Sequence, residues 1–598
     1  MTAKISPPEH FKLDEGQAKG YDPIVVEGIL SFIRPYSKPF LFSLVLLIIG
    51  ASAQVAGPYY VKIALDNGIA VHDYIALRTA VVLYFITALL QWGVTYARIN
   101  IMAFIGQSII FDIRARLFEH IQHLSLQFFS HYSVGRLISR VINDVGVLRE
   151  FITWSILATA RNLLTVVGIV IAMLALNLRL SLLTFTVLPL IAVATIIFRK
   201  HIQDVYRRVR AGISWVNSVL AENINGVRVV QAFSRQAYNY SYFRDTVNRY
   251  HLDNNLHSGR LVSIFFPSID LIGTLAVSLV VWLGGAAVLG EKVTPGVLVA
   301  FILYIERFFQ PIQDLSRRYD QFQSSMIGGE RILELLNMES EIQDAPDAVE
   351  LPMIEGKVKF VNVSFYYSDD PSTLVLKNIY LEAQPGQTIA LVGETGAGKS
   401  TIIRLLSRFY DPTTGSVQVD GTDLREITQA SLRSQMGIVL QDPFLFGSTV
   451  LENINFGRLN ATREEVVAAA RAVGAHEFIN ALRDGYDTDV EEGGALLSVG
   501  QRQLISFGRA LLADPRILIL DEATSSVDTQ TEQVIQGALA TLLKGRTSFV
   551  IAHRLSTIIN ADQIIVLHKG EIIERGTHAE LLDHGGYYYK LYSMGFQE

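Results

Sequence analysis

The first 340 residues contain about six long runs of apolar side chains, each long enough to cross roughly 30 Å of hydrocarbon as a helix. The run from Pro39 to Tyr60 reads PFLFSLVLLIIGASAQVAGPYY, and the run from Leu163 reads LLTVVGIVIAMLAL without a charge. Soluble cores rarely need such runs, so the pattern predicts an α-helical transmembrane domain with about six helices. The approximate centres of the runs are Leu46, Phe85, Val167, Leu188, Ala276 and Leu303.

Two long polar connections separate these runs, one between the second and third and one between the fourth and fifth. The connections lack clusters of glycine and proline and keep a helical spacing of apolar residues, as in Ile110, Ile113 and Leu117. We therefore expect the helices to continue far beyond the bilayer and to turn at a short helix. Similar spacing from Tyr21 to Pro35 allows either an amphipathic helix on the inner leaflet or a solvent-exposed arm.

Basic residues are concentrated in these two connections and are sparse in the other loops. The positive-inside rule therefore places both connections and both chain termini in the cytoplasm, as expected of a multi-pass protein of the cell (inner) membrane. The basic residues of the connections are Arg114, Arg116, Arg136, Arg140 and Arg149 in the first, and Arg199, Lys200, Arg207, Arg208, Arg210, Arg228, Arg235, Arg244 and Arg249 in the second.

The hydrophobic pattern changes after residue 337. Residues 337–356 are polar and acidic, and an alternation typical of strands begins at Val358. We therefore predict a cytoplasmic arm over residues 1–22, a transmembrane domain over 23–336, a linker over 337–356 and an α/β domain over 357–598.

Composition narrows the class of protein further. Hydrophobic residues make up 50% of the 598 residues and charged residues only 18%, which excludes a disordered or fibrous chain. The net charge of −6 gives no general attraction to nucleic acid, and we expect no nucleic-acid partner. The absence of cysteine excludes disulfides, thiolate metal sites and cysteine catalysis.

A phosphate-binding loop occurs in the context that it requires. The apolar strand Thr388–Val392 leads into the glycine-rich run GETGAGKST, and a helical pattern follows. The glycines let backbone N–H groups point at phosphates, and the helix N-terminus adds positive potential. Lys399 is expected to reach the β- and γ-phosphates of ATP, and the Ser400 hydroxyl to bind Mg²⁺. The nucleotide-binding residues of the loop are Gly393, Glu394, Thr395, Gly396, Ala397, Gly398, Lys399, Ser400 and Thr401.

Two acids follow a second apolar strand. The strand Ile517–Leu520 ends in Asp521 and Glu522. An acid at the carboxyl end of a buried parallel strand lies in the crevice where ligands bind. There Asp521 is suited to hold Mg²⁺ and Glu522 to polarise the attacking water.

The run Leu497-Ser-Val-Gly-Gln501, shortly before this second strand, resembles the signature of ATP-binding cassette (ABC) proteins. Val499 stands where glycine is commonest in the family. The resemblance implies that Tyr367 stacks on adenine and that Gln441 is the Q-loop residue, which also contacts Mg²⁺. It further implies a D-loop with Ser525 and Asp528, and catalytic roles for Glu522, Gln441 and the switch histidine His553.

The resemblance covers nearly the whole chain and is closest to bacterial half-size ABC exporters of the multidrug and lipid-flippase type. The stretch FFSHYSVGRLISRVINDV from Phe128 matches the first intracellular loop of that group, and ENINGVRVVQAF from Glu222 matches the second. In such exporters the short helix of the second loop docks into the partner's cassette. The resemblance therefore implies ATP-driven export of a hydrophobic or amphipathic substrate (drug, lipid or peptide) by alternating access.

The signature of this family acts on ATP that is bound to a second cassette, so a chain with one cassette must pair with another half-transporter. The signature residues are Leu497, Ser498, Val499, Gly500 and Gln501. A homodimer is favoured, and a catalytically competent subunit of a heterodimer is the main alternative. An ATP-gated channel or regulatory membrane receptor is a further alternative on the same scaffold.

Four ionisable residues lie within the predicted membrane helices. Such groups are costly there unless they face a partner or a cavity. The sequence leaves open whether they fix helix packing or line a substrate cavity together with nearby phenylalanines. The four residues are Arg161, Asp270, Glu306 and Arg307.

Overall fold

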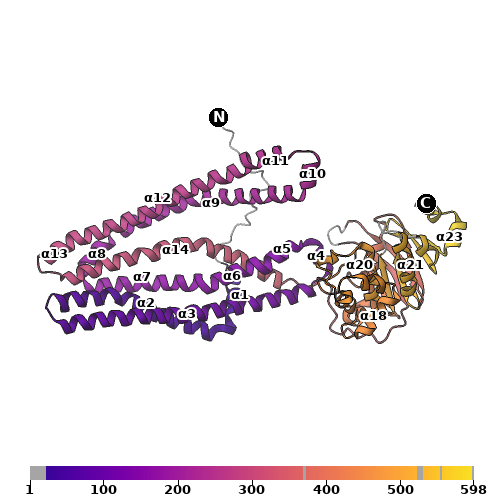
Figure 1. The fold of residues 1–598 in the computed structure, drawn as a ribbon, viewed down its shortest axis with the longest axis horizontal. Helices are drawn as coiled ribbons and strands as arrows, with labels where there is room; N and C mark the ends of the chain where they lie inside the picture. The colour runs from indigo at the N-terminus through magenta and orange to yellow at the C-terminus, as the bar shows by residue number, and fades with distance from the viewer. Residues whose placement is uncertain (1–21, 368–371, 522–528, 553–554, 596–598) are drawn as a thin grey trace. The chain divides into compact units, whose positions relative to one another are not determined.

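The computed structural model describes residues 22–367, 372–521, 529–552 and 555–595 (Figure 1). The chain divides into two compact units. The first contains residues 22–122 and 133–338, and the second contains 123–132 and 339–598. Residues 123–132 include the short helix α4 (Leu126–His131), which lies in the predicted first intracellular loop and groups with the second unit.

The first unit is built of long helices (Figure 1). At 1.5 Å per residue, the 50 residues of α3 span about 75 Å, far more than the roughly 30 Å of hydrocarbon. The helices therefore continue well beyond the bilayer, as the periodicity predicts. The helices are α1 (Pro23–Ile33), α2 (Ser37–Ile63), α3 (Tyr74–His123), α5 (Val134–Ser139), α6 (Val145–Glu150), α7 (Ile156–Leu176), α8 (Leu178–Phe185), α9 (Leu188–Asn225), α10 (Val227–Ala232), α11 (Gln236–Tyr242), α12 (Arg249–Leu279), α13 (Gly285–Leu289) and α14 (Pro295–Leu336).

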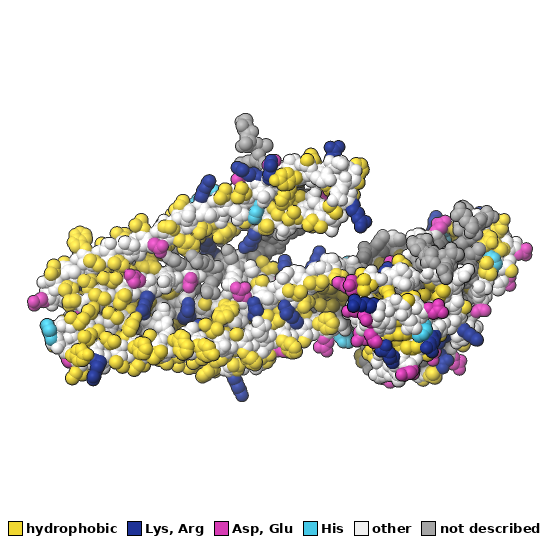
Figure 2. Space-filling view, in the orientation of Figure 1, with side chains coloured by type: hydrophobic (Ala, Val, Ile, Leu, Met, Phe, Trp, Pro, Cys, Tyr) yellow, Lys and Arg dark blue, Asp and Glu magenta, His cyan; other side chains and the backbone are white. Residues whose placement is uncertain are grey.

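Five helical stretches within the described residues are long and apolar enough to cross a membrane: 23–69, 74–123, 134–176, 178–225 and 236–289. The sixth predicted run, centred on Leu303, lies in α14, a further helix of 42 residues. Apolar side chains cover much of the visible surface of these helices (Figure 2), as expected where lipid replaces water. On α3, for example, Phe85 is 63% exposed and Trp92 is 70% exposed.

Two groups of helices pack within this unit. Helices α2, α7 and α14 contact one another, and α9 packs along α12 (Figure 1). The apolar core includes the fully buried Phe301 and Tyr304 of α14 and Ala276 of α12. The predicted short helix of the second connection is α10, which lies with α11 at the end of the α9–α12 hairpin (Figure 1).

The amino-terminal stretch forms the helix α1, so a solvent-exposed arm is wrong for residues 23–33. Its buried side chains include Val25, Ile29 and Phe32. The helix packs against α14, where small residues allow close approach: a Cβ atom at Gly329 would lie 2.9 Å from the Ile29 side chain. Burial of this apolar face stabilises the helix against α14.

The second unit contains two sheets. An antiparallel sheet has the order β2-β1-β4-β5, and a larger sheet has the order β10-β9-β3-β8-β7-β6, in which β10 alone pairs antiparallel. The strands are β1 (Val358–Phe365), β2 (Leu376–Ala383), β3 (Thr388–Val392), β4 (Thr414–Val419), β5 (Thr422–Asp423), β6 (Met436–Val439), β7 (Ile517–Asp521), β8 (Thr547–Ile551), β9 (Gln563–His568) and β10 (Glu571–Gly576).

Alternating side chains divide the core of this unit in two. In β7, Ile517 and Ile519 pack in one apolar cluster with the smaller sheet, whereas Leu518 and Leu520 pack in another with the helices. This period of two is the one expected of a strand that is buried on both faces. The helices are α15 (Lys399–Leu406), α16 (Gln429–Arg433), α17 (Val450–Asn455), α18 (Arg463–Ala472), α19 (His476–Ala481), α20 (Val499–Leu512), α21 (Thr529–Leu543), α22 (Leu555–Ile559), α23 (His578–His584) and α24 (Tyr587–Gly595).

Candidate nucleotide site

The register of the larger sheet brings the predicted site residues to one edge. Leu391 at the end of β3 and Asp521 at the end of β7 are both paired with Ile551 of β8. These strands are parallel, so their carboxyl ends meet at the same edge. The phosphate loop follows β3 directly, and the exposed Gln441 follows β6 two residues after Val439. The phosphate loop, Gln441 and Asp521 therefore lie at the same edge of the sheet.

The phosphate loop has a backbone that requires glycine at two positions. Gly393 has φ 156° and Gly398 has φ 105°. A Cβ atom at Gly393 would lie 2.3 Å from the Leu567 carbonyl oxygen, and one at Gly398 would lie 2.6 Å from the Leu376 side chain. Real Cβ atoms essentially never lie this close to another atom, and both glycines also have a positive φ that side chains rarely adopt. The loop is thus held against the strands around it, and α15 begins directly after Gly398.

Lys399 is buried inside the loop and binds the loop's own backbone. Its Nζ donates to the carbonyl oxygens of Gly393 at 2.5 Å and of Glu394 at 2.9 Å. Burial lowers the pKa of the Lys399 ammonium, and the nearby charge of Asp521 partly opposes this shift. This effect agrees with the sheet register, which brings the predicted phosphate ligand and the predicted magnesium ligand to the same edge.

The donor atoms at this edge fit a magnesium ion. Ser400 is exposed and carries a hydroxyl, Gln441 carries an amide oxygen, and the half-buried Asp521 carries a carboxylate. Mg²⁺ prefers oxygen ligands of this kind and usually completes its octahedron with water and substrate phosphates.

Tyr367 lies beside the helix that follows the phosphate loop. Its hydroxyl is 3.1 Å from Thr401 Oγ1 and accepts a hydrogen bond from Arg404 Nη1 at 3.0 Å. The ring makes edge-to-face contacts with Phe365 and Tyr410 and remains half-exposed. A partly exposed aromatic ring next to α15 is suited to stack on a base.

The signature begins the long helix α20. Ser498 is its N-cap and forms a capping box with Gln501, in which Gln501 N donates to Ser498 Oγ at 3.2 Å and Ser498 N donates to Gln501 Oε1 at 2.9 Å. Leu497 and Gly500 are buried, whereas Ser498 and Val499 are exposed. Leu497 packs in the helical cluster, whereas Ala397 of the phosphate loop packs in the other cluster. The signature and the loop therefore belong to separate cores of one chain.

Four of the predicted catalytic and D-loop residues, Glu522, Ser525, Asp528 and His553, lie outside the described residues. Their roles stay predictions from the sequence.

The structure adds a contact to the phosphate loop that the sequence does not predict. Tyr587, the first residue of α24, donates a hydrogen bond from its hydroxyl to Glu394 Oε1 at 2.7 Å. The backbone N–H groups of Tyr587 and Tyr588 donate to the carboxylate of Glu574, which fixes the start of this helix. The hydrogen bond to the Glu394 carboxylate raises the pKa of Tyr587. The carboxyl-terminal helix is thus tied to the loop.

Replacing Tyr587 with phenylalanine is expected to weaken ATP binding modestly. The variant loses one exposed hydrogen bond to a charged group, which is worth about 0.5–1.5 kcal/mol, so the KM for ATP should rise about 2–10-fold with little change in kcat. Steady-state ATPase measurements over a range of ATP concentrations test this. Tyr589→Phe, which removes an exposed hydroxyl from the same helix, is the control and should behave as the wild type.

In the first unit, the structure places Arg307 on the backbone of α2. Pro58 lies inside α2 and has no N–H to offer Gln54, four residues earlier. Arg307 Nη1 donates to that carbonyl oxygen at 2.5 Å. Tyr304 lies one turn before Arg307 on α14, and its hydroxyl donates to the carbonyl oxygen of Val55, the residue after Gln54, at 2.7 Å. Arg307 therefore satisfies a backbone group that the proline leaves without its helical partner.

A cavity of about 540 Å³ lies between α2, α7 and α14. Its lining is mostly apolar and includes Val55, Tyr59, Gly168 and Tyr304. The four ionisable residues predicted for a substrate cavity, Arg161, Asp270, Glu306 and Arg307, are not among the described residues that line it. Asp270 and Glu306 are exposed on the surface of this unit, and Arg161 is half-buried.

Replacing Arg307 with methionine is expected to destabilise the packing of α2 on α14. Methionine keeps the length of the side chain but leaves the Gln54 carbonyl without a donor, which costs about 1–3 kcal/mol when the group is buried. The apparent melting temperature of the detergent-solubilised protein should fall. Glu306→Gln is the matched control, because Glu306 is adjacent and exposed; an equal fall in both variants would contradict the role of the hydrogen bond.

Comparison with known proteins agrees with this geometry. Residues 40–312 match the family described as ABC transporter transmembrane region, and residues 376–525 match the family described as ABC transporter. The chain is 40% identical to "Uncharacterized ABC transporter ATP-binding protein YknV" of Bacillus subtilis, over 97% of this chain and 96% of that protein. It is 37% identical to an ATP-dependent lipid A-core flippase of Syntrophus aciditrophicus, over 96% and 95% of the two chains.

A solved structure of a bacterial Atm1-family ABC exporter with ATP bound superimposes with a TM-score of 0.77 and 28% identity, over 94% of this chain and 99% of that one. The match includes both the helical unit and the α/β unit. The chain therefore belongs to the ABC transporter family, as a half-size exporter that couples ATP hydrolysis to transport across a membrane.

Proposed function

We propose that two copies of this chain pair head to tail and hold two ATP molecules between their α/β domains. Each ATP is bound by Lys399 of one copy and by Ser498 and Gly500 of the other. The observation that carries this proposal is the separation of the two motifs: the phosphate loop and the exposed start of α20 belong to different cores of the same chain. The positive N-terminus of α20 suits the phosphates of a nucleotide on a second copy.

Within each site, the residues of this chain have distinct tasks. Tyr367 stacks on adenine, the phosphate loop binds the phosphates, and Ser400, Gln441 and Asp521 hold Mg²⁺, which neutralises phosphate charge when it is bound. Glu522 polarises the attacking water, and His553 acts as the switch histidine that the resemblance implies. Lys399 must exchange its bonds to the Gly393 and Glu394 carbonyls for phosphate oxygens.

The end of the α9–α12 hairpin is a second surface for the partner copy. Val229 of α10 is 62% exposed, and Phe233, which follows this helix, is 72% exposed. Tyr238 of α11 is 68% exposed. Exposed apolar residues at the end of a hairpin that extends beyond the bilayer need cover. A cassette of the second copy provides it, so movement of the cassettes on ATP binding reaches the membrane helices and drives alternating access.

The substrate that this geometry favours is hydrophobic or amphipathic, as a drug or a lipid is. The mostly apolar cavity between α2, α7 and α14 is large enough for part of such a molecule. The basic cytoplasmic connections orient the protein in the cell (inner) membrane, with both termini and the ATPase domain in the cytoplasm. A homodimer is the favoured assembly, and a heterodimer is the alternative.

Reconstitution into lipid vesicles tests the function. The purified chain should hydrolyse ATP, and a panel of drugs, lipids and peptides should contain compounds that stimulate hydrolysis and accumulate in vesicles only with ATP. Native mass spectrometry of the protein expressed alone should give twice the mass of one chain. ATP-dependent ion currents across a bilayer without substrate movement would contradict export and support a channel.

A further inference from the structure

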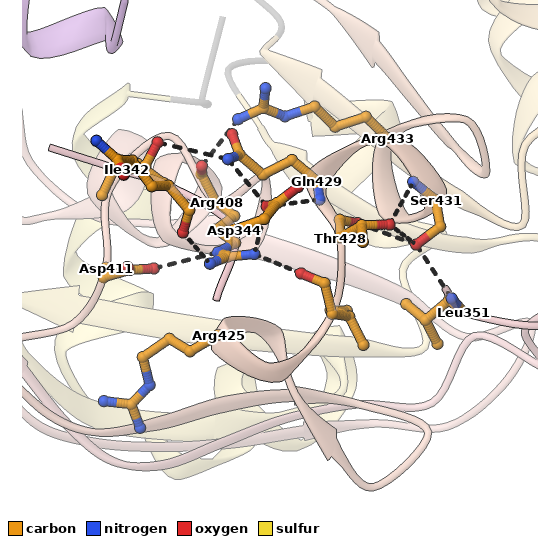
Figure 3. Close-up of polar contacts among 12 residues, drawn as sticks. Ile342, Asp344, Leu351, Arg408, Asp411, Arg425, Thr428, Gln429, Ser431 and Arg433 are labelled. Atoms are coloured by element: carbon orange, nitrogen blue, oxygen red, sulfur yellow. Dashed lines mark hydrogen bonds and ion pairs between the residues drawn. The ribbon is translucent and has the colours of Figure 1, made fainter. Parts of the chain in front are cut away.

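A buried arginine lies directly behind the phosphate-loop helix. Arg408 follows α15 by two residues and is only 2% exposed (Figure 3). Its Nη1 donates to the Ile427 carbonyl oxygen at 2.5 Å, and its Nε is 3.5 Å from Asp411 Oδ1. The guanidinium is thus fixed in the core of the α/β unit, at the end of the helix that begins with Lys399.

This arginine also holds the segment that connects α14 to the first strand. Nη2 donates to the Gln343 carbonyl oxygen at 3.1 Å, and Nη1 lies 3.3 Å from Asp344 Oδ1. The same oxygen of Asp344 accepts hydrogen bonds from the Gln429 backbone N at 3.0 Å and the Gln429 side chain at 3.1 Å (Figure 3). Charge-assisted hydrogen bonds of this kind are stronger than neutral ones.

The segment is attached a second time further along. Val349 N donates to the Glu426 carbonyl oxygen at 2.9 Å, and Thr428 N donates back to the Val349 carbonyl at 3.0 Å. Residues 339–356, which belong to the linker predicted over 337–356, therefore do not form a free tether and group with the α/β unit. Between the two attachments, Pro346 and Asp347 are exposed.

The first attachment comes soon after the membrane helix ends. α14 ends at Leu336, eight residues before Asp344, and a chain extends at most about 3.3–3.6 Å per residue, so the connection spans no more than about 30 Å. A shift of the cytoplasmic end of α14 beyond this reach must pull on Asp344. Because Asp344 is bound to Arg408, such a displacement also moves the carboxyl end of α15. Lys399 is the first residue of that helix.

We propose that Asp344 and Arg408 form an anchor that couples nucleotide binding at Lys399 to the cytoplasmic end of α14 within one chain. The two are positioning residues and take no part in the chemistry. This coupling in one chain is separate from the contacts between copies, and it rests on the proposed function only in that the loop must bind ATP. An ion pair with one buried and one partly exposed partner adds little net stability, but its directed hydrogen bonds select one position of the segment.

Hydrogen exchange in the full-length protein tests the anchor, with a non-hydrolysable ATP analogue as the probe. In the wild type, the analogue should protect amides of α15 and also change exchange in residues 321–336 at the end of α14. Asp344→Asn should keep the protection of α15 and lose the change in α14. Asp344 suits substitution because its side chain is 37% exposed, whereas truncation of the fully buried Arg408 risks unfolding.

Matched controls separate the anchor from a general effect of the segment. Asp347→Asn makes the same change of charge at an exposed position and should behave as the wild type. A Gly-Ser-Gly-Ser insertion between Glu339 and Ser340 adds slack before the anchor and should abolish the change in α14. The same insertion between Pro346 and Asp347 adds slack after the anchor and should preserve it.

Each result has a distinct meaning. A change in α14 that survives Asp344→Asn, or that both insertions abolish equally, would overturn the anchor. Protection of α15 in the wild type without any change in α14 would overturn it as well. Absence of protection at α15 itself would contradict the nucleotide site of the proposed function, and with it the input that the anchor transmits.

Discussion

Replacing Glu522 with glutamine is expected to leave ATP binding intact and to reduce steady-state ATP turnover by about 10²–10⁴-fold, the usual contribution of a general base. Glutamine keeps the size and the hydrogen-bonding reach of the side chain but cannot accept the proton of the attacking water. Because ATP then stays bound between the cassettes, the two copies should remain closed. ATPase assays and retention of labelled ATP after gel filtration measure the two effects.

Asp521→Asn is an informative comparison for this variant. It removes the carboxylate predicted to hold Mg²⁺, so it should reduce turnover and also weaken the retention of nucleotide in the presence of magnesium. Normal turnover in Glu522→Gln would refute the assignment of the catalytic base and point to another acid near the crevice.

The local fold of the candidate nucleotide site was largely predictable from the sequence because its signals are local. A strand, a glycine-rich run and a helix follow one another from Thr388 to Leu406, and each has its own pattern. The position of Asp521 followed from a rule for parallel sheets, since it ends a buried strand, whereas Gln441 was predicted only from the resemblance to the ABC family.

The contacts that tie distant segments together were not predictable. Arg408 meets Asp344 across 64 residues, and Tyr587 meets Glu394 across 193. A surface or core arginine has the same local pattern, so the sequence gives no sign of which carboxylate it meets. The partner of Arg307 is harder still to predict, because it is the backbone carbonyl of Gln54. Every residue has such a carbonyl, so the residue type does not identify the acceptor. The sequence marked Arg307 as an ionisable residue in a membrane helix, and Pro58 was the signal for its acceptor, since the proline leaves that carbonyl without a helical donor.

In the membrane domain, too, local features were predictable from the sequence and contacts between distant segments were not. Hydropathy predicted the long apolar helices because lipid selects for them along each segment. The packing of α1 on α14 depends on small residues such as Gly329 and on the position of Ile29, and these become meaningful only once the two helices lie together.

Mixed dimers are expected to distinguish a shared nucleotide site from a site within one chain. In the proposed dimer, each site takes Lys399 from one copy and Ser498 from the other. A dimer of one Lys399→Ala chain and one Ser498→Arg chain places both defects in the same site and leaves the other site intact. A dimer of the double variant with a wild-type chain has a defect in each site. The first dimer should therefore retain trapped nucleotide and the second should lose it, although both contain the same two substitutions.

The measurement needs dimers of defined composition, which two different affinity tags and sequential purification provide. Trapped nucleotide per dimer is then counted with labelled ATP in the Glu522→Gln background, where hydrolysis does not release it. Ser498→Arg blocks the exposed start of α20 with a bulky side chain, and Lys399→Ala removes the ammonium from the phosphates, so each change disables one contribution only. If the site lay within one chain, the order would be reversed: the wild-type copy of the second dimer would trap nucleotide and the first dimer would trap none.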